Sequence, residues 1–271
     1  MDEYELNAEI QNVYCMLDAD SLPELHDYFD SIIDEDCGVS DDPFEIANRI
    51  LACDKPEKLP SAVRGLVITL FDEAFARGNA DAYNDLGAQY YDGSRGFEQN
   101  FTKSVEYYKL AAEKGSRQAQ ENLGYCYYYG RNMPVDYEKA FHYFALGAFD
   151  GHLISLYKIG DMYASGYYVE KNEKEAFLIY ERCMDTMTDE AAEVVAGPVL
   201  LRLGKCFLYG IGTKADYESA LVCYQKAEYY LYEMVKSGNM MYYKSLQAAI
   251  KGQSDARAKL SESLPENDWK F

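Results

Sequence analysis

The stretch AQENLGYCYYYGRNMPVDYEKAFHYFALGAFDG, from Ala119 to Gly151, decides the fold. It predicts a helix that ends at a glycine turn, then a polar N-cap residue and a second helix. An apolar residue followed by glycine marks each copy of the pattern, at Leu86-Gly87, Leu123-Gly124, Ile159-Gly160 and Leu203-Gly204. These pairs recur after 37, 36 and 44 residues. Self-similarity at a period of this size indicates a solenoid of helical hairpins.

Each copy carries the residues that helix ends require. A glycine suited to the left-handed conformation closes the first helix, at Gly93, Gly130, Gly166 and Gly210. A side chain able to accept backbone hydrogen bonds opens the second helix, at Asn100, Asp136, Asn172 and Asp216. The glycine after each Leu or Ile lies inside a helix, where it costs about 1 kcal/mol relative to alanine. Its recurrence predicts close packing between helices and has no catalytic meaning.

This pattern resembles the Sel1-like repeat, a relative of the tetratricopeptide repeat. The second copy matches it most fully, through Ala119, Leu123-Gly124, Tyr127, Gly130, Asp136, Lys139-Ala140, Tyr143, Ala148 and Gly151. The third copy departs from it, since the alanine pair before the following glycine is missing. The resemblance implies an all-α fold, a right-handed α/α superhelix (solenoid) of Sel1-like helix-turn-helix repeats with helical caps. It says little about the partner.

The pattern also suggests how the chain is divided. Residues 1–77 are predicted to form a helical N-terminal cap, and residues 252–271 a C-terminal cap and tail. Between them, residues 78–251 hold about four repeats and a partial one, at 78–114, 115–150, 151–194 and 195–238. About eight extra residues after Cys183 predict a lengthened helix or a loop. Beyond the fourth repeat, two short helices are expected, at 240–251 and 254–260.

Composition limits the classes of partner. The formal net charge is −20, which disfavours nucleic acids and anionic membrane surfaces because both are bound by Lys and Arg. A basic protein segment is permitted as a partner. No apolar run approaches the length that spans a bilayer, and the acidic start at 1–5 lacks the features of a secretory signal. A cytoplasmic protein of bacterial origin is therefore expected.

The seven cysteines are an odd number, at Cys15, Cys37, Cys53, Cys126, Cys183, Cys206 and Cys223. The resemblance brings in cysteine-rich secreted relatives that have a disulfide in each repeat, and this chain lacks that pattern. Reduced thiols, mostly buried, are the favoured interpretation. A Cys206–Cys223 bridge within one repeat is the alternative.

Nothing in the sequence forms a convincing catalytic or metal site. The three histidines have no metal-ligand spacing, and no cysteine pair is separated by two residues. The S-x-x-K match at Ser155–Lys158 lacks the companion motifs of β-lactamases and penicillin-binding proteins, and Ser155 falls on the predicted buried face. We therefore expect no enzyme and no cofactor, with a β-lactamase-like hydrolase as a weak alternative.

A binding surface is predicted on the first helices, which line the concave groove in repeats of this class. Positions two before and two or five after each Leu or Ile lie opposite the buried stripe. Tyrosine is favoured at interfaces because it buries much area and keeps a polar tip. The predicted protein- or peptide-binding residues are Asn84, Tyr91, Glu121, Tyr125, Tyr128, Tyr157 and Asp161. The alternative is that these tyrosines pack against neighbouring helices.

The predicted function is that of a non-enzymatic adaptor that holds a protein or peptide segment in the groove. In the main alternative the protein is a self-associating scaffold, and the same aromatic face is a contact between copies. The sequence indicates neither the partner nor the oligomeric state.

Overall fold

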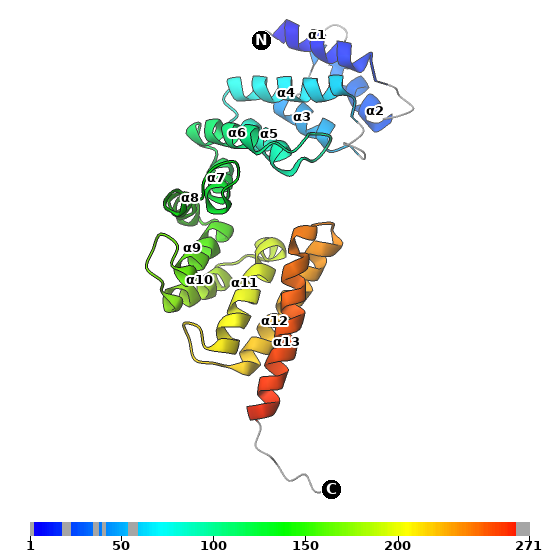
Figure 1. The fold of residues 1–271 in the computed structure, drawn as a ribbon. Coiled ribbons are helices and arrows are strands. Elements are labelled where there is room, and N and C mark those ends of the chain that lie inside the picture. Colours follow the sequence, from blue (N-terminus) through cyan, green and yellow to red (C-terminus); the bar gives the residue numbers. More distant parts are fainter. Residues whose placement is uncertain (1–2, 18–22, 35–37, 40–41, 54–58, 264–271) are drawn as a thin grey trace. The chain divides into compact units, whose positions relative to one another are not determined.

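The computed structural model describes residues 3–17, 23–34, 38–39, 42–53 and 59–263 (Figure 1). The chain forms two compact units, residues 1–136 and 137–271, called here the N-terminal and C-terminal units. The N-terminal unit contains α1 (Glu3–Tyr14), α2 (Pro23–Ile32), β1 (Ile33–Asp34), β2 (Gly38–Val39), α3 (Pro43–Leu51), α4 (Ser61–Ala76), α5 (Asp81–Asp92), α6 (Phe101–Glu113) and α7 (Arg117–Tyr129). The C-terminal unit contains α8 (Tyr137–Phe149), α9 (Leu153–Ser165), α10 (Glu173–Asp185), α11 (Asp189–Tyr209), α12 (Tyr217–Lys236), the short 3-10 helix η2 (Met240–Tyr242) and α13 (Tyr243–Ser263).

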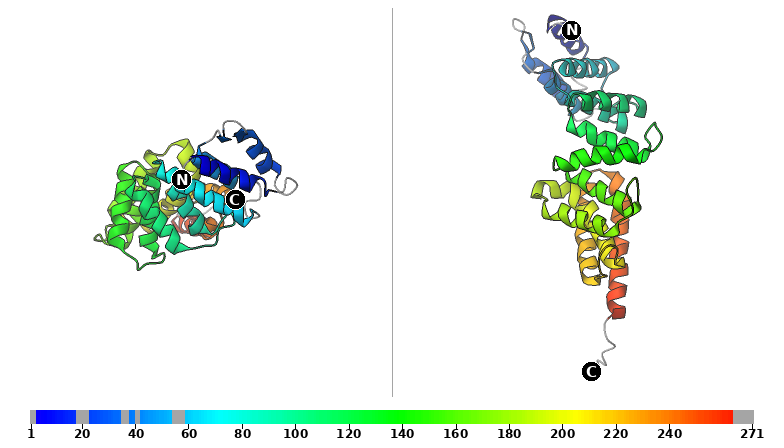
Figure 2. Two further views of the ribbon diagram at one scale, coloured as in Figure 1. Left: turned by 90° about the horizontal axis from the view of Figure 1, so that it is seen from above. Right: turned by 90° about the vertical axis from the view of Figure 1, so that its left-hand side faces the viewer.

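Within each unit the helices pair as successive hairpins, which confirms the all-α solenoid (Figures 1 and 2). The two helices of a repeat contact each other, as in α5 with α6, α9 with α10 and α11 with α12. First helices of consecutive repeats also contact each other, α5 with α7 and α9 with α11. The Leu or Ile of each Leu-Gly or Ile-Gly pair is buried, as the repeat pattern predicts.

The turns are formed by the predicted residues. Gly93, Gly130, Gly166 and Gly210 cap the first helices at φ values of 64, 66, 72 and 67°, a region that glycine enters without a Cβ penalty. At the start of the second helices, the Asn100 side chain accepts a hydrogen bond from the Lys103 amide, and that of Asn172 accepts one from the Glu175 amide. Asp216 accepts hydrogen bonds from two amides.

In three of the first helices, the glycine inside the helix makes room for an aromatic ring. A Cβ at Gly87 would lie 2.8 Å from the Tyr108 ring, and one at Gly160 would lie 2.6 Å from the Tyr180 ring. A Cβ at Gly204 would likewise lie 2.9 Å from the ring of Tyr224. Each tyrosine comes from the second helix of the same repeat, so the glycine allows the two helices of a hairpin to approach closely. The recurrence of this glycine therefore follows from packing.

The extra residues after Cys183 form a lengthened helix. α11 has 21 residues and begins after Thr188, whose hydroxyl accepts a hydrogen bond from the Ala191 amide. Its added turns pack closely against the long α12: a Cβ at Gly197 would lie only 2.9 Å from the side chain of Leu231. The fourth hairpin is longer than the others for this reason.

The end of the chain differs from the prediction of two short helices. Residues 243–263 form one continuous helix, α13, which runs through Gly252. Gly252 has a packing role inside the helix and does not end it. A Cβ at this position would lie 2.5 Å from the Tyr224 ring, so the glycine leaves space for that ring. The outer side of α13 is polar, including exposed Lys244, Gln247 and Lys251. Such a face suits the last helix of a solenoid.

The core of the N-terminal helices is continuous with the core of the first repeat. One cluster of buried side chains runs from Leu6 on α1 to Leu86 and Tyr90 on α5. Phe75 of α4 stacks on Tyr83 of α5, with ring centroids 3.8 Å apart. Beside the predicted helices of this cap, the described residues contain the short strands β1 and β2, where Ile33 pairs with Val39. The division at residue 77 stays a prediction.

The six cysteines in the described residues are all free thiols, so the Cys206–Cys223 bridge is not formed. Cys126, Cys183 and Cys206 are buried. Burial raises the pKa of the Cys126 thiol to about 12 and that of Cys206 to about 11, which keeps these groups protonated and unreactive near neutrality. Cys37 lies outside the described residues.

Candidate functional site

The structure separates the seven predicted binding residues into two groups. Asn84, Glu121 and Tyr157 are buried, with only 6, 4 and 5% of their surfaces exposed, so the expectation of a solvent-facing position was wrong for them. Tyr91, Tyr125, Tyr128 and Asp161 are partly exposed. For Asn84 and Tyr157 the physical reason is that first helices of consecutive repeats lie against one another. Asn84 meets Asn122 on α7, and Tyr157 meets Arg202 on α11, instead of an open groove.

In the N-terminal unit this contact between first helices is a row of amides and carboxylates. The Asn122 side chain on α7 donates a 2.9 Å hydrogen bond to the Asn84 carbonyl oxygen on α5. Asn84 donates in turn to Asp85, which also accepts a 3.4 Å hydrogen bond from Asn48 on α3. Burial raises the pKa of Asp85, while the two amides lower it. We call this row and its counterpart in the C-terminal unit the polar ladder.

In the C-terminal unit the ladder is an ion pair between α9 and α11. Arg202 donates from Nε and Nη2 to the two carboxylate oxygens of Asp161, over 2.5 and 2.6 Å. The Tyr180 hydroxyl donates to the same carboxylate over 2.8 Å, and Lys158 Nζ lies 3.7 Å from it. The Arg202 guanidinium also lies 4.7 Å from the centroid of the Tyr157 ring. Asp161 and Tyr157 thus hold two repeats together.

The ion pair shifts the titration of its members. Burial alone would raise the pKa of Asp161, but the charge and hydrogen bonds of Arg202, with Lys158 and Tyr180, hold that pKa below its usual range. Burial and the Asp161 charge raise the pKa of Tyr180. Burial alone would lower the pKa of Arg202, but Asp161 raises it, so the pair stays ionised at neutral pH.

The lowered pKa predicts how acid acts on the C-terminal unit. A carboxyl with a depressed folded-state pKa stabilises the fold above its unfolded value, about 4, and loses that contribution as the pH falls through the folded value. Between pH 5 and 2, the unfolding free energy of Asp161→Asn should therefore fall less steeply than that of wild type, by up to about 1.4 kcal/mol per pH unit. Urea titrations at each pH measure both slopes. Parallel curves would contradict the assignment.

The remaining predicted residues meet in a second arrangement, entirely within the N-terminal unit. Arg131 follows Gly130, the glycine cap of α7, and its guanidinium carbon lies 5.9, 5.3 and 5.7 Å from the ring centroids of Tyr91, Phe101 and Tyr129. Arg131 Nε donates a 3.2 Å hydrogen bond to the Tyr91 hydroxyl. Three elements supply the rings: the end of α5, the start of α6 and the end of α7. The helix caps bring them together.

Along α7 the aromatic contacts continue. Tyr129 lies 6.1 Å from Tyr125 in a stacked geometry and 4.9 Å from Tyr128 in an edge-on geometry, between ring centroids. Tyr129 is 48% exposed, and Arg131 is also exposed. We call the whole set the Arg131 surface: Tyr91, Phe101, Tyr125, Tyr128, Tyr129 and Arg131.

Three members of the Arg131 surface were missed by sequence reasoning. Phe101 is the first residue of α6, Tyr129 the last of α7, and Arg131 lies in the turn. The groove prediction followed helix faces and therefore passed over helix ends. The triple tyrosine at 127–129, followed by Gly-Arg, is a signal that could have found two of them.

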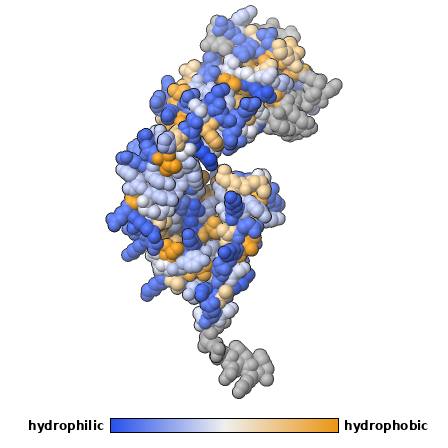
Figure 3. All heavy atoms as spheres, viewed as in Figure 1, coloured by the Kyte–Doolittle hydropathy of each residue, from blue (hydrophilic) through white to orange (hydrophobic). Residues whose placement is uncertain are grey.

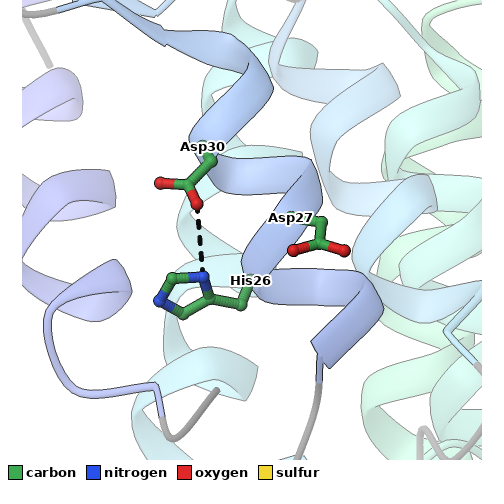
Figure 4. A group of neighbouring side chains, drawn as sticks. All are labelled: His26, Asp27 and Asp30. Atoms are coloured by element: carbon green, nitrogen blue, oxygen red, sulfur yellow. Dashed lines mark ion pairs between the residues drawn. The ribbon is translucent and has the colours of Figure 1, made fainter.

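One group of side chains could hold a metal ion in the described residues. His26, Asp27 and Asp30 on α2 offer ligand atoms within 4.8 Å of one another (Figure 4). Figure 4 shows His26 turned toward Asp30, with Nδ1 3.4 Å from the carboxylate. Asp30 also accepts a hydrogen bond from the Tyr14 hydroxyl, which raises the pKa of Tyr14 to about 12. Both aspartates are exposed, and the contacts of Asp30 with His26 and Tyr14 account for the positions of these side chains without a metal ion.

The S-x-x-K match does not form a nucleophile site. Ser155 is fully buried, and its hydroxyl has no hydrogen-bond partner among the described residues. Lys158, with only 5% of its surface exposed, lies near Asp161. Because the Ser155 side chain is buried, the hydroxyl is not presented to a substrate, and the match does not form the exposed nucleophile that the motif requires.

Comparison with known proteins agrees with the hairpin geometry. A profile of the Sel1 repeat matches residues 80–116, 117–152, 153–182 and 198–228. The chain is a Sel1-like repeat protein. The crystal structure of c5321, a protective antigen of uropathogenic Escherichia coli displaying an SLR fold, is similar to it at a TM-score of 0.57 and 20% identity, over 81% of this chain and 48% of that one. This likeness concerns the fold.

Two curated relatives extend the comparison of this Sel1-like protein. The mouse protein sel-1 homolog 2 is 32% identical over 169 residues, which cover 62% of this chain and 23% of the relative. The Arabidopsis thaliana protein HRD3B, a component of an ERAD-associated E3 ubiquitin-protein ligase, is 36% identical over 76 residues, or 28% of this chain and 12% of the relative. The chain thus spans less than a quarter of the length of these two relatives. Among the helices of the described residues, none is long and apolar enough to cross a membrane.

Proposed function

We propose that this Sel1-like repeat protein is a non-enzymatic adaptor that binds a segment of a partner protein on the Arg131 surface. The observation that carries the proposal is the gathering of five aromatic rings and one arginine, from three helix ends, at a partly exposed place. Tyrosine and arginine are the residues enriched at protein interfaces and at their energetic centres. Tyr129, one of the five rings, is 48% exposed.

The family supports a role in protein binding. HRD3B is by its name a component of a ligase assembly, and solenoids present extended surfaces suited to binding other chains. The net charge permits a basic segment as partner, and the predicted binding residues include two carboxylates, Glu121 and Asp161. Glu121 is buried, and Asp161 is paired with Arg202, so the charge of the partner has to be argued from other residues.

The proposal is tested by affinity capture from cells of the source organism with three immobilised proteins. They are wild type, a Tyr125→Ala/Tyr128→Ala/Tyr129→Ala variant, and a control variant Tyr229→Ala/Tyr232→Ala. The control tyrosines are 64 and 53% exposed on α12, so it removes similar side chains elsewhere. We expect a protein retained by wild type and control and lost by the triple variant, because truncating aromatic anchors costs about 2 kcal/mol or more each.

Circular dichroism of the triple variant must show an unchanged helix content for that result to count. Equal retention by all three proteins would exclude the Arg131 surface. If nothing is retained and light scattering shows a mass that rises with concentration and falls in the triple variant, the surface is a contact between copies of the chain.

A further inference from the structure

The charge state of the Arg131 surface differs from that of the rest of the protein. The chain has 46 acidic residues and 26 lysines and arginines, and the view in Figure 3 shows hydrophilic residues over much of the described surface. Two other arginines pair with carboxylates, Arg77 with Glu73 and Arg202 with Asp161. Within the described residues, Arg131 has no carboxylate partner. Its contacts are the three rings and the Tyr91 hydroxyl.

The guanidinium is nevertheless held in place. The hydrogen bond from Nε to Tyr91 and the surrounding rings restrict its orientation. The terminal Nη groups have no acceptor in the described part of the protein and remain available as donors. A planar guanidinium presents such donors in the geometry of a carboxylate, which it binds through two parallel hydrogen bonds.

The described charged residues near Arg131 do not provide a carboxylate that accepts hydrogen bonds from its guanidinium. Asp92 follows Tyr91 directly, yet its pKa is raised by burial, and no cation lowers it. Lys103 lies over the Tyr90 ring, at 4.8 Å from its centroid, and hydrogen-bonds to the Tyr90 hydroxyl. The Arg131 surface therefore combines one oriented cation with an apolar, aromatic surround.

We infer that Arg131 binds a carboxylate of the partner segment, either an Asp or Glu side chain, while the adjoining rings pack against apolar side chains beside it. The inference rests on the proposed function and names the chemistry of its partner. It makes the partner locally acidic and replaces the basic segment that net charge alone permits. The rings exclude water from one side of the guanidinium, which strengthens its attraction for a carboxylate.

The test uses a library of acetylated and amidated nonapeptides, so that terminal charges play no part. Each peptide retained by the wild-type protein is made again with its acidic residue changed to Gln or to Lys. Wild type should bind the acidic version about tenfold more tightly than the Gln version, as expected for a charge-assisted bidentate pair. The Lys version should bind more weakly still.

Three variants locate the effect. Arg131→Gln should bind the acidic and Gln peptides equally, and Arg131→Lys should keep part of the preference. The control Arg182→Gln removes one positive charge from an exposed position on α10 and should keep the full preference. A charge preference that survives in Arg131→Gln, or is absent in wild type for the peptides it retains, would overturn the inference and leave the adaptor proposal standing. Failure of wild type to retain any peptide would count against both.

Discussion

Replacing Arg202 with methionine should destabilise the C-terminal unit by about 3 kcal/mol. The substitution leaves the Asp161 carboxylate, only 15% exposed as a side chain, without its main partner, and uncompensated buried charges cost about 3–5 kcal/mol. Lys158, at 3.7 Å, keeps the expected cost at the lower end. In a thermal melt followed by circular dichroism, the corresponding transition should move down by about 10 °C.

The double variant Asp161→Asn/Arg202→Met distinguishes a lost charge balance from lost packing. Replacing both partners removes the unpaired carboxylate, and the amide introduced in its place still offers a carbonyl oxygen to the Tyr180 hydroxyl. Since removal of both ions is often nearly neutral, the double variant should recover most of the stability. A single variant as stable as Arg182→Gln would show that the pair does not hold α9 and α11 together.

Gly252→Ala should also destabilise the protein, although alanine is the better helix former. The added methyl group would stand 2.5 Å from the Tyr224 ring, which is also packed closely against Gly204, where a Cβ position lies 2.9 Å from the same ring. Overpacking of this kind costs about 1–3 kcal/mol, which exceeds the helix-propensity gain of about 1 kcal/mol. We expect earlier urea unfolding of the C-terminal unit.

Gly65→Ala is the matched control for this substitution. Gly65 also lies inside a helix, α4, but a Cβ there would meet nothing within 4 Å. The change should therefore stabilise the protein, by about 0.5–1 kcal/mol. If both alanine variants shift stability in the same direction, the close packing of α13 on Tyr224 is not what keeps Gly252.

The fold was predictable because its determinants are local. Gly93, Gly130 and Asn100 act through backbone conformation and hydrogen bonds within a few residues of their own position. The Leu-Gly pair likewise marks the middle of each first helix from the local sequence alone. After Cys183 the sequence left a lengthened helix and a loop as alternatives, and the continuity of α13 was not predicted, since both features depend on partners far along the chain, at Leu231 and Tyr224.

The candidate site was predictable only in part. Tyr91, Tyr125 and Tyr128 lie on one partly exposed surface, as their helix positions suggested. The prediction that Asn84, Glu121 and Tyr157 face solvent was wrong. The position of a residue around its own helix does not reveal which side of that helix a neighbouring element covers. Their roles in binding, like those of the three tyrosines, stay predictions.

The polar ladder also bears on how such an array can be rebuilt. Purely apolar repeats can be duplicated or exchanged, because any Leu stripe fits any other. Here the two junctions between first helices within the units have different partners: an amide faces an amide between Asn84 and Asn122, while a carboxylate faces a guanidinium between Asp161 and Arg202. Moving the helix of Asn122 beside Asp161 would leave a charge facing an amide. The side chains at the junctions therefore fix the order of the repeats. A repeat moved to another position would keep its hydrogen bonds only if the neighbouring repeat were moved with it.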